Sequence, residues 1–390
     1  MKRKNAGHEL DFIAEQYEEI KNIVIYGIGE QGNELRSILE QIQFEKYYTI
    51  SYVDKNYKTM SYVNSPEWLL RMENKNVLIV ITIAKEEVRR RLIAILFQNG
   101  FSKNNICDLN EFYSLILPML TVYYTNKLYI DSVQISIGDK CNLNCADCTN
   151  FIPYMKNRKN RSLNSLIEDI DLLFDRIDYV RHMPVLGGET FLHSQLFEFV
   201  SYLLQKYGKR IGQIWIYTNG TLPNRIESRF VNLLNVYESK IHFFVSNYTH
   251  QNPKLKKAFV EFVDILDRGK ISYVYIDNFI WTDTGISNLK KKEHTDLCGF
   301  VSLCSQPCRD YEDGKIYYCA IAKYAGKAFE ISDQKNEIDI NVASKKEIVE
   351  FLLGYIDSGY LDVCAYCNGY DEFTNTQTVE AGIQMEKVRK

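Results

Sequence analysis

The alternation of short apolar strands with amphipathic helices constrains the fold of this chain more than any other feature. The first expected strands lie at 22–26, 48–53 and 77–83, with a last short one from Ile106. A helix follows the first strand and another is expected over 86–98. Because parallel neighbouring strands need a crossover connection, this alternation predicts parallel sheets covered by helices.

A second, longer series of strands and helices begins at residue 131. Its expected strands are 132–137, 184–186, 213–217, 240–246 and 271–276, and its expected helices are 163–177, 196–207, 225–236 and 255–266. Repeated strand–helix units of this length predict a partial (β/α)6 barrel related to the TIM barrel. Functional residues gather at the carboxyl ends of the strands in such barrels.

The resulting fold class is α/β with six segments. These are an N-terminal extension (1–20), a small doubly wound parallel sheet (21–112), a connector (113–130), the barrel (131–297), a small cysteine-rich domain (298–375) and a polar tail (376–390). The cysteine-rich segment has few helical patterns before residue 345, so we expect metal to stabilise it.

The composition indicates an ordinary globular protein. Hydrophobic residues make up 46%, charged residues 25%, and the net charge is −3. Nothing here indicates a nucleic-acid partner, and no signal peptide or membrane-spanning stretch is recognisable. We therefore expect a cytoplasmic protein, in which clustered cysteines serve as metal ligands and not as disulfides.

Cys141, Cys145 and Cys148 lie within eight residues, just after the first strand of the expected barrel. Three thiolates on a loop can ligate three irons of a [4Fe–4S] cluster and leave the fourth iron open. An open coordination position is what a metal needs to bind another molecule. Structural zinc is the alternative, but its fourth ligand would be remote, the nearest downstream candidate being His182.

This Cys-x-x-x-Cys-x-x-Cys triplet after a first strand resembles the radical S-adenosylmethionine (SAM) superfamily. The resemblance implies that the open iron chelates SAM and that an electron from the cluster cleaves it. A 5′-deoxyadenosyl radical then takes a hydrogen atom from the substrate. An external donor such as flavodoxin or ferredoxin would reduce the cluster. One departure is Asp147, where the family often has an aromatic residue.

Three further motifs end the next strands, and the resemblance covers about residues 131–280. Gly187-Gly188-Glu189 resembles the family's motif that receives the amino group of SAM, since a carboxylate accepts hydrogen bonds from an ammonium group. Thr218-Asn219 and Ser246-Asn247 end the following strands and suit a ribose or a carboxylate. Each pair alone is equally compatible with a common turn.

A second group of thiols lies in the cysteine-rich segment. The expected ligands are Cys319, Cys364 and Cys367, with Cys304 or Cys308 as the fourth and Cys298 as a further candidate. Gly314 suits a hairpin that presents Cys319. The spacing resembles the SPASM or twitch extensions of radical SAM enzymes, which implies an auxiliary [4Fe–4S] cluster, one in number here. Zinc remains the alternative, because four thiolates suit it equally well.

The first strand runs into Gly27-x-Gly29-x-x-Gly32, and Asp54 ends the next strand. This is the context of a dinucleotide-binding turn, with the acid placed for a ribose. The segment is, however, about half a dinucleotide fold and resembles small Rossmann-like domains of sugar-tailoring proteins. NAD, another nucleotide and a ligand-free structural role are all compatible with it.

Three functions are compatible with these features. The leading one is a radical SAM enzyme that abstracts hydrogen from a small polar metabolite, such as a sugar or nucleotide-sugar, giving dehydrogenation or epimerisation. His193, His250 and Asp283 are polar groups considered for that substrate. The second is modification of a ribosomal peptide, and the third is a non-enzymatic scaffold stabilised by zinc.

Overall fold

The computed structural model describes residues 2–3, 9–72, 76–226, 228–237, 239–277, 280–288, 290–291, 297–302, 304, 308–331, 334–356, 359–370 and 378–385. The chain divides into two compact units. One consists of Gly7–Asp131, and the other of Met1–Ala6 together with Ser132–Lys390.

The Gly7–Asp131 unit contains a parallel sheet in the order β3-β2-β4-β5. Its strands are β2 (Asn22–Tyr26), β3 (Thr49–Val53), β4 (Val77–Ile81) and β5 (Ile106–Asp108). Its helices are α1 (Glu9–Glu15), α2 (Glu30–Gln41), α3 (Pro66–Leu69), α4 (Glu86–Gln98), α5 (Leu109–Glu111), a π-helix (Phe112–Ile116) and α6 (Leu117–Thr125). The predicted strand–helix alternation is confirmed in this unit.

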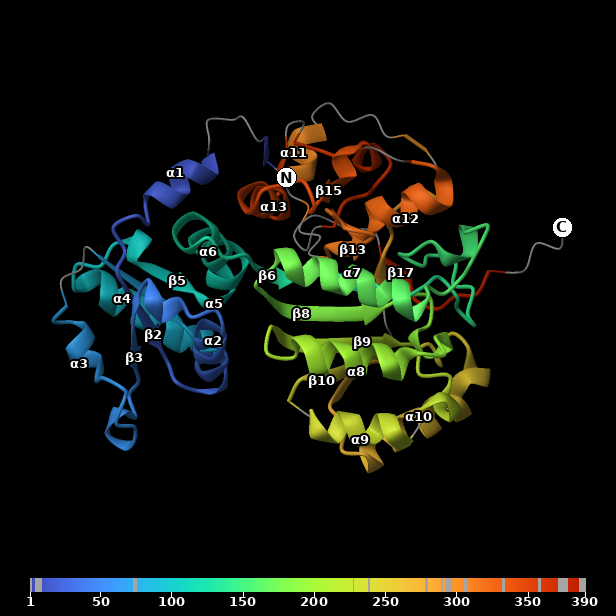
Figure 1. Ribbon diagram of the computed structural model, residues 1–390, viewed down its shortest axis with the longest axis horizontal. Helices are drawn as coiled ribbons and strands as arrows, with labels where there is room; N and C mark the ends of the chain where they lie inside the picture. Colours follow the sequence, from blue (N-terminus) through green and yellow to red (C-terminus); the bar gives the residue numbers. More distant parts are fainter. Residues whose placement is uncertain are drawn as a thin grey trace. The chain divides into compact units, whose positions relative to one another are not determined.

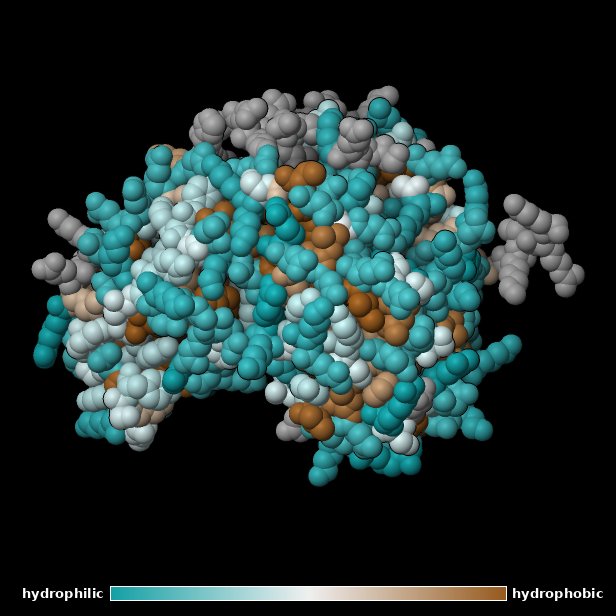
Figure 2. Space-filling view, viewed as in Figure 1, coloured by the Kyte–Doolittle hydropathy of each residue, from teal (hydrophilic) through white to brown (hydrophobic). Residues whose placement is uncertain are grey.

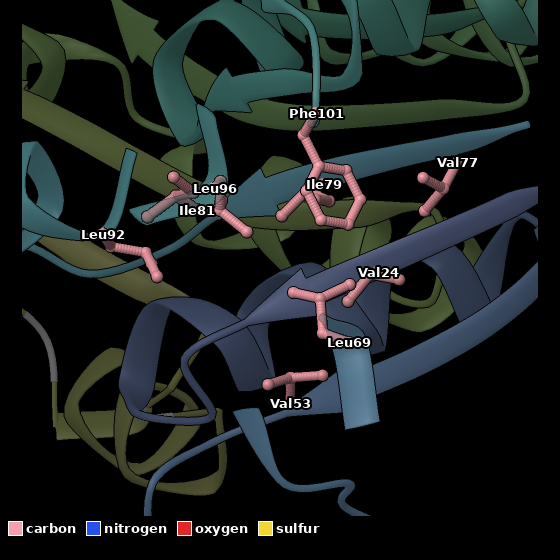
Figure 3. Close-up of a cluster of buried hydrophobic side chains, with 9 residues drawn as sticks. All are labelled: Val24, Val53, Leu69, Val77, Ile79, Ile81, Leu92, Leu96 and Phe101. Atoms are coloured by element: carbon pink, nitrogen blue, oxygen red, sulfur yellow. The ribbon is translucent and has the colours of Figure 1, made fainter. Parts of the chain in front are cut away.

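The core of this unit forms around β4, whose residues are all buried. Figure 3 shows side chains from β2, β3, β4, α3, α4 and the loop after α4 gathered in one cluster. They are Val24, Val53, Leu69, Val77, Ile79, Ile81, Leu92, Leu96 and Phe101. A continuous apolar run such as Val-Leu-Ile-Val-Ile is typical of a central parallel strand, because both of its faces are covered.

The expected connector at 113–130 is instead mostly helical. The π-helix and α6 together run from Phe112 to Thr125 and bury much of their apolar surface. Pro118 lies inside this continuous helical run, directly after the π-helix, and has no backbone N–H to donate to the preceding turn. Strand β6 (Tyr129–Ser132) then spans the boundary between the two units.

The second unit contains a series of parallel strands, the first four of which are each followed by a helix. The strands are β7 (Gln134–Ser136), β8 (Tyr179–Leu186), β9 (Ile211–Thr218), β10 (Ile241–Ser246) and β11 (Tyr273–Ile276). The helices are α7 (Leu163–Arg176), α8 (Leu196–Tyr207), α9 (Ser228–Val236) and α10 (Lys256–Arg268). Figure 1 shows these helices following one another alongside the strands. The predicted parallel α/β organisation is confirmed.

The cysteine-rich segment continues the same sheet. Strand β13 (Asp310–Glu312) pairs in parallel with β7 and antiparallel with β14 (Lys315–Tyr317), which pairs with β15 (Glu337–Asp339). The β13–β14 turn contains Gly314, with a φ of 74°, as the hairpin prediction requires. The helices of this segment include α11 (Leu297–Ser302), α12 (Ala320–Phe329), α13 (Lys345–Leu352) and the 3-10 helix Asp362–Ala365. Two short strand pairs also occur in this unit. They are β12 (Ile280–Thr282) with β17 (Thr378–Glu380), and β1 (Lys2–Arg3) with β16 (Tyr355–Ile356).

A buried ion network joins α12 to β13. The ammonium group of Lys323 contacts the carboxylate of Asp310 and lies 2.9 Å from that of Glu312, which Lys327 also contacts at 2.7 Å. Burial raises the pKa of Glu312, but the two ammonium groups outweigh it and lower the pKa to about 2. A buried lysine is tolerated here because it is paired on two sides.

In the ranges that the structure describes, no helix is both long enough and apolar enough to cross a bilayer. The face seen in Figure 2 is largely hydrophilic, with scattered apolar residues.

Candidate active site

The cysteine loop, residues 138–151, is held by close backbone contact with the end of β8. The N–H of Gly188 donates to the carbonyl of Gly138 at 2.9 Å, and that of Glu189 to Lys140 at 2.7 Å. A Cβ atom would lie 2.5 Å from the Gly138 oxygen at Gly187 and 2.4 Å from the Lys140 oxygen at Gly188. These two glycines therefore permit the approach of another backbone, in addition to the ligand contact that the motif predicts.

A cavity of about 450 Å³, here called the triplet cavity, lies at the carboxyl ends of these strands. It brings together most of the residues predicted for the SAM site: Cys141, Cys145, Cys148, Gly187, Gly188, Glu189, Thr218, Asn219 and Ser246. Asn247 is not among the lining residues, because its amide donates to the carboxylate of Asp277 at 2.7 Å. Parallel strands explain the convergence, since their carboxyl ends meet at one edge of the sheet.

The carboxylate of Glu189 has protein partners of its own. One oxygen accepts from the Thr218 hydroxyl at 2.7 Å, and the other from the backbone N–H of Asn219 at 2.8 Å. The Phe191 N–H donates as well, at 3.0 Å. Burial raises the pKa of Glu189, although these hydrogen bonds oppose the shift. In the structure this carboxylate ties the end of β8 to the end of β9, and its predicted role toward an ammonium group stays a prediction.

Asn142, between two of the cysteines, is a site residue that sequence reasoning missed. Its amide N–H donates to the Thr221 hydroxyl at 2.7 Å, and its oxygen accepts from the Asn219 amide at 3.0 Å. The sequence signal was an asparagine inside the triplet. Its partner Asn219 lies 77 residues away, and no local sequence pattern connects the two residues. Asn142 thus fastens the cysteine loop to the end of β9.

The three thiols of the triplet suit a cluster in number, and all three residues line the triplet cavity. Burial raises the pKa of Cys141 to about 12 and that of Cys145 to about 11, so both are protonated at neutral pH in the absence of a metal. Cluster binding would release these protons, because the thiolate is the ligand. Among the described residues, no three Cys, His, Asp or Glu side chains are already drawn together as metal ligands. The thiols instead face a common space.

A second, smaller cavity of about 30 Å³, here called the four-thiol cavity, is lined by Cys304, Cys319, Cys364 and Cys367. Its other walls are mainly apolar and include Phe300, Val301, Ile321, Leu361 and Val363. Cys308 lines the triplet cavity instead. Of the three candidates for a fourth ligand, only Cys304 lines this cavity with the other three thiols, and Cys308 and Cys298 do not.

The two cavities share part of their lining. Ile321, in the first turn of α12, and Tyr370 border both of them. Cys319 precedes α12 and accepts the N–H of Ala322 on its sulfur at 3.3 Å. The helix that starts at one thiol therefore forms the wall between the two groups of thiols.

The C-terminal strap, residues 378–385, lies against the cysteine loop. The sequence predicted a polar tail over 376–390. Its described part instead pairs with β12, and Gln384 forms a bridge with Cys145. The Gln384 amide donates to the Cys145 sulfur at 3.2 Å. No periodic pattern marks this contact, so sequence reasoning missed it.

The remaining candidates lie elsewhere. His193 is buried and contacts the Arg161 carbonyl at 2.9 Å, outside the triplet cavity. Asp283 accepts the N–H of Gly285 at 2.7 Å. Neither of these residues, nor His250, lines the triplet cavity. Cys298 lies in α11 and does not line the four-thiol cavity.

The glycine-rich turn of the first unit has part of the expected geometry. Gly27 has a φ of 108°, and a Cβ at Gly32 would lie 2.0 Å from the Gly27 oxygen, whereas one at Gly29 would meet nothing within 4 Å. The Asp54 carboxylate accepts the N–H of Ile28 at 2.9 Å and that of Asn56 at 2.8 Å. The carboxylate that the sequence predicted for a ribose therefore hydrogen-bonds to the backbone of the glycine-rich turn and of the loop after β3.

No protein-family model matches the chain, and no curated protein matches it. Among solved structures, BtrN in complex with AdoMet and 2-DOIA is 16% identical, with a TM-score of 0.41 over 62% of this chain and 94% of BtrN. Native anSMEcpe with bound AdoMet is 13% identical, with a TM-score of 0.40 over 63% of this chain and 92% of anSMEcpe. Streptococcus suis SuiB is 19% identical, with a TM-score of 0.26 over 55% of this chain and 54% of SuiB.

At these TM-scores the similarity assigns no role to any residue.

Proposed function

We propose that this chain is a radical SAM enzyme whose [4Fe–4S] cluster is held by Cys141, Cys145 and Cys148. The observation that carries the proposal is the triplet cavity, where three thiols share one space with the ends of β8, β9 and β10. Three thiolates leave one iron of a cluster without a protein ligand. The cavity has room beside the thiols for the molecule that this iron would bind.

The residues around the thiols supply polar groups for SAM. Gly187 and Gly188 line the cavity, and Ser246 adds a hydroxyl-bearing residue. Glu189 acts indirectly, because its hydrogen bonds hold Thr218 and Asn219 in place. When bound, the cluster supplies the electron that breaks the sulfur–C5′ bond of SAM and so starts hydrogen-atom abstraction.

The four-thiol cavity is the proposed site of a second [4Fe–4S] cluster, with Cys304, Cys319, Cys364 and Cys367 as ligands. Four thiols in a small apolar pocket suit a closed site of this kind. Zinc would accept the same ligands, so metal analysis must separate the two. Cys308 is left facing the triplet cavity.

The proposed substrate is a small polar metabolite such as a sugar or nucleotide-sugar. Ile321 and Tyr370 line both cavities, so the two groups of thiols border neighbouring spaces. A cluster in the four-thiol cavity would supply a one-electron acceptor there, which favours dehydrogenation over epimerisation. An external donor such as a flavodoxin or ferredoxin would reduce the first cluster. For the glycine-rich turn, the engaged Asp54 favours a ligand-free structural role.

Anaerobic purification and reconstitution test this proposal. We expect about eight irons per chain, with broad absorbance near 400 nm, and 5′-deoxyadenosine on addition of SAM and dithionite. Candidate sugars, nucleotide-sugars and peptides are then compared in deuterated buffer, with label read in 5′-deoxyadenosine and product. A colourless protein with stoichiometric zinc would refute the proposal, and turnover of peptides alone would replace the proposed substrate class.

A further inference from the structure

We propose that Gln384 is a positioning residue for the cluster on the triplet: its side-chain amide donates a hydrogen bond to the Cys145 sulfur and raises the reduction potential of that cluster. The inference rests on the proposed function, because it requires a cluster on the cysteine loop. It adds a residue from the opposite end of the chain, outside every motif that the sequence offered.

The backbone of the C-terminal strap runs antiparallel to the cysteine loop. The N–H of Ala146 donates to the Ile383 carbonyl at 2.8 Å, and the N–H of Met385 donates to the Asn144 carbonyl at 2.8 Å. These two bonds flank the bridge between Cys145 and Gln384. The strap therefore fixes the stretch of loop that carries the middle thiol of the triplet.

The Gln384 amide is oriented by partners at both of its ends. Its oxygen accepts the N–H of Asn144 at 2.7 Å, and its nitrogen donates to the Gly382 carbonyl at 2.7 Å. An oxygen cannot donate to that carbonyl and a nitrogen cannot accept from that N–H, so the reversed amide is excluded. The remaining N–H is the one that faces the Cys145 sulfur, with Nε2 and Sγ 3.2 Å apart.

The strap is held independently of this contact. It pairs with β12 through Thr378–Glu380, and the Glu380 carboxylate accepts from the Gln251 amide at 2.9 Å. Gly382 has a φ of 87°, and a Cβ there would lie 2.8 Å from Tyr248, which lines the triplet cavity. A residue supported on both sides can hold its side chain in one orientation, as a tuning contact requires.

A hydrogen bond to a ligand sulfur favours the more negative state of a cluster. Reduction adds one negative charge, part of which is carried by the sulfur ligands, and a donor stabilises that charge. Hydrogen bonds to sulfur are among the factors that set cluster potentials. Removing the Gln384 donor should therefore make the cluster harder to reduce, even when its iron is retained.

The test is a redox titration of the reconstituted full chain, followed by electron paramagnetic resonance with and without SAM. The signal that changes with SAM belongs to the cluster on the triplet, since that cluster has the open iron. Gln384→Leu removes the donor, and Gln384→Met is measured in its place if the leucine variant loses iron. Gln251→Leu is the matched control, because it loosens the strap without touching the cysteine loop.

We expect the Gln384 variant to have wild-type iron content and, at a fixed potential, about a tenfold lower ratio of reduced to oxidised cluster. For a one-electron couple this corresponds to about 59 mV. Gln251→Leu should titrate like the wild type. Loss of triplet iron in both Gln384 variants, with Gln251→Leu fully loaded, would also support the positioning role.

An unchanged midpoint in an iron-replete Gln384 variant would overturn the inference and leave the proposed function intact. A wild-type protein without any SAM-responsive signal would instead overturn the proposed function, and the inference with it.

Discussion

In the proposed function, the triplet cavity and the four-thiol cavity use cysteine thiols for two different purposes. The triplet cavity is about 450 Å³ and has three thiols among strand ends, whereas the four-thiol cavity is about 30 Å³ and has four thiols among apolar side chains. Four thiols can saturate a cluster or a zinc ion, and three cannot saturate a cluster. The count of thiols and the space beside them thus distinguish a site that binds a further molecule from a site that is closed.

The largest effect is expected from removing the triplet. Replacing Cys141, Cys145 and Cys148 with alanine should abolish 5′-deoxyadenosine formation and leave about four irons per chain in the four-thiol cavity. Chromatographic detection of 5′-deoxyadenosine and iron analysis measure the two halves of this expectation. Cys107→Ala is the control, because that buried thiol belongs to the other unit. Residual SAM cleavage by the triple variant would show that the triplet does not hold the cluster that cleaves SAM.

Cys304 and Cys308 provide a matched pair for the second cavity. Cys304→Ala should remove the cluster of the four-thiol cavity and about half of the iron, because this cavity of about 30 Å³ has little space for a molecule that could replace the lost thiol. Cys308→Ala should keep all of the iron, since this thiol lines the other cavity. Equal iron loss in both variants would contradict the assignment of Cys304 to the four-thiol cavity and of Cys308 to the triplet cavity.

Gly188→Ala tests how tightly the cysteine loop is held against β8. The added Cβ would lie 2.4 Å from the Lys140 carbonyl oxygen, so the loop backbone must move. We expect SAM binding to weaken about a hundredfold, because displacements of about an ångström at a site cost this much. Isothermal titration calorimetry on the reconstituted protein measures it. Gly29→Ala, with a φ of −83° and open space around its Cβ, should bind SAM normally.

The smallest effect concerns the ion network that supports the wall between the cavities. Glu312→Gln should lower the free energy of unfolding at pH 7 by about 1–2 kcal/mol, since the amide oxygen still accepts hydrogen bonds from the lysines. The native pKa of about 2 lies below the ordinary value of 4.5. The difference between the proteins is therefore present above pH 4.5 and lost as the pH falls toward 2. Urea unfolding at pH 7 and near pH 2 measures it. A difference that is unchanged near pH 2 would contradict this origin.

The sequence was informative wherever a feature repeats or clusters locally. The β-branched runs of β2 and β4 and the motif Gly187-Gly188-Glu189 could be read directly, because burial on both faces and backbone crowding leave local signatures. Helix α12 was missed because Lys323 interrupts its apolar face, and only the distant Asp310 and Glu312 explain that lysine. The hydrogen-bond partners of Glu189 and Asn142 depend on which strands become neighbours in the sheet. No local sequence pattern indicates that order.

The contact between Gln384 and Cys145 also sets an order of events during synthesis. The two residues are 239 positions apart, so the ribosome completes all three cysteines long before the glutamine emerges. Until Gln384 emerges, the cysteine loop of the nascent chain lacks its contact with the C-terminal strap. The cysteine loop can therefore take the form described above only after translation has passed residue 384.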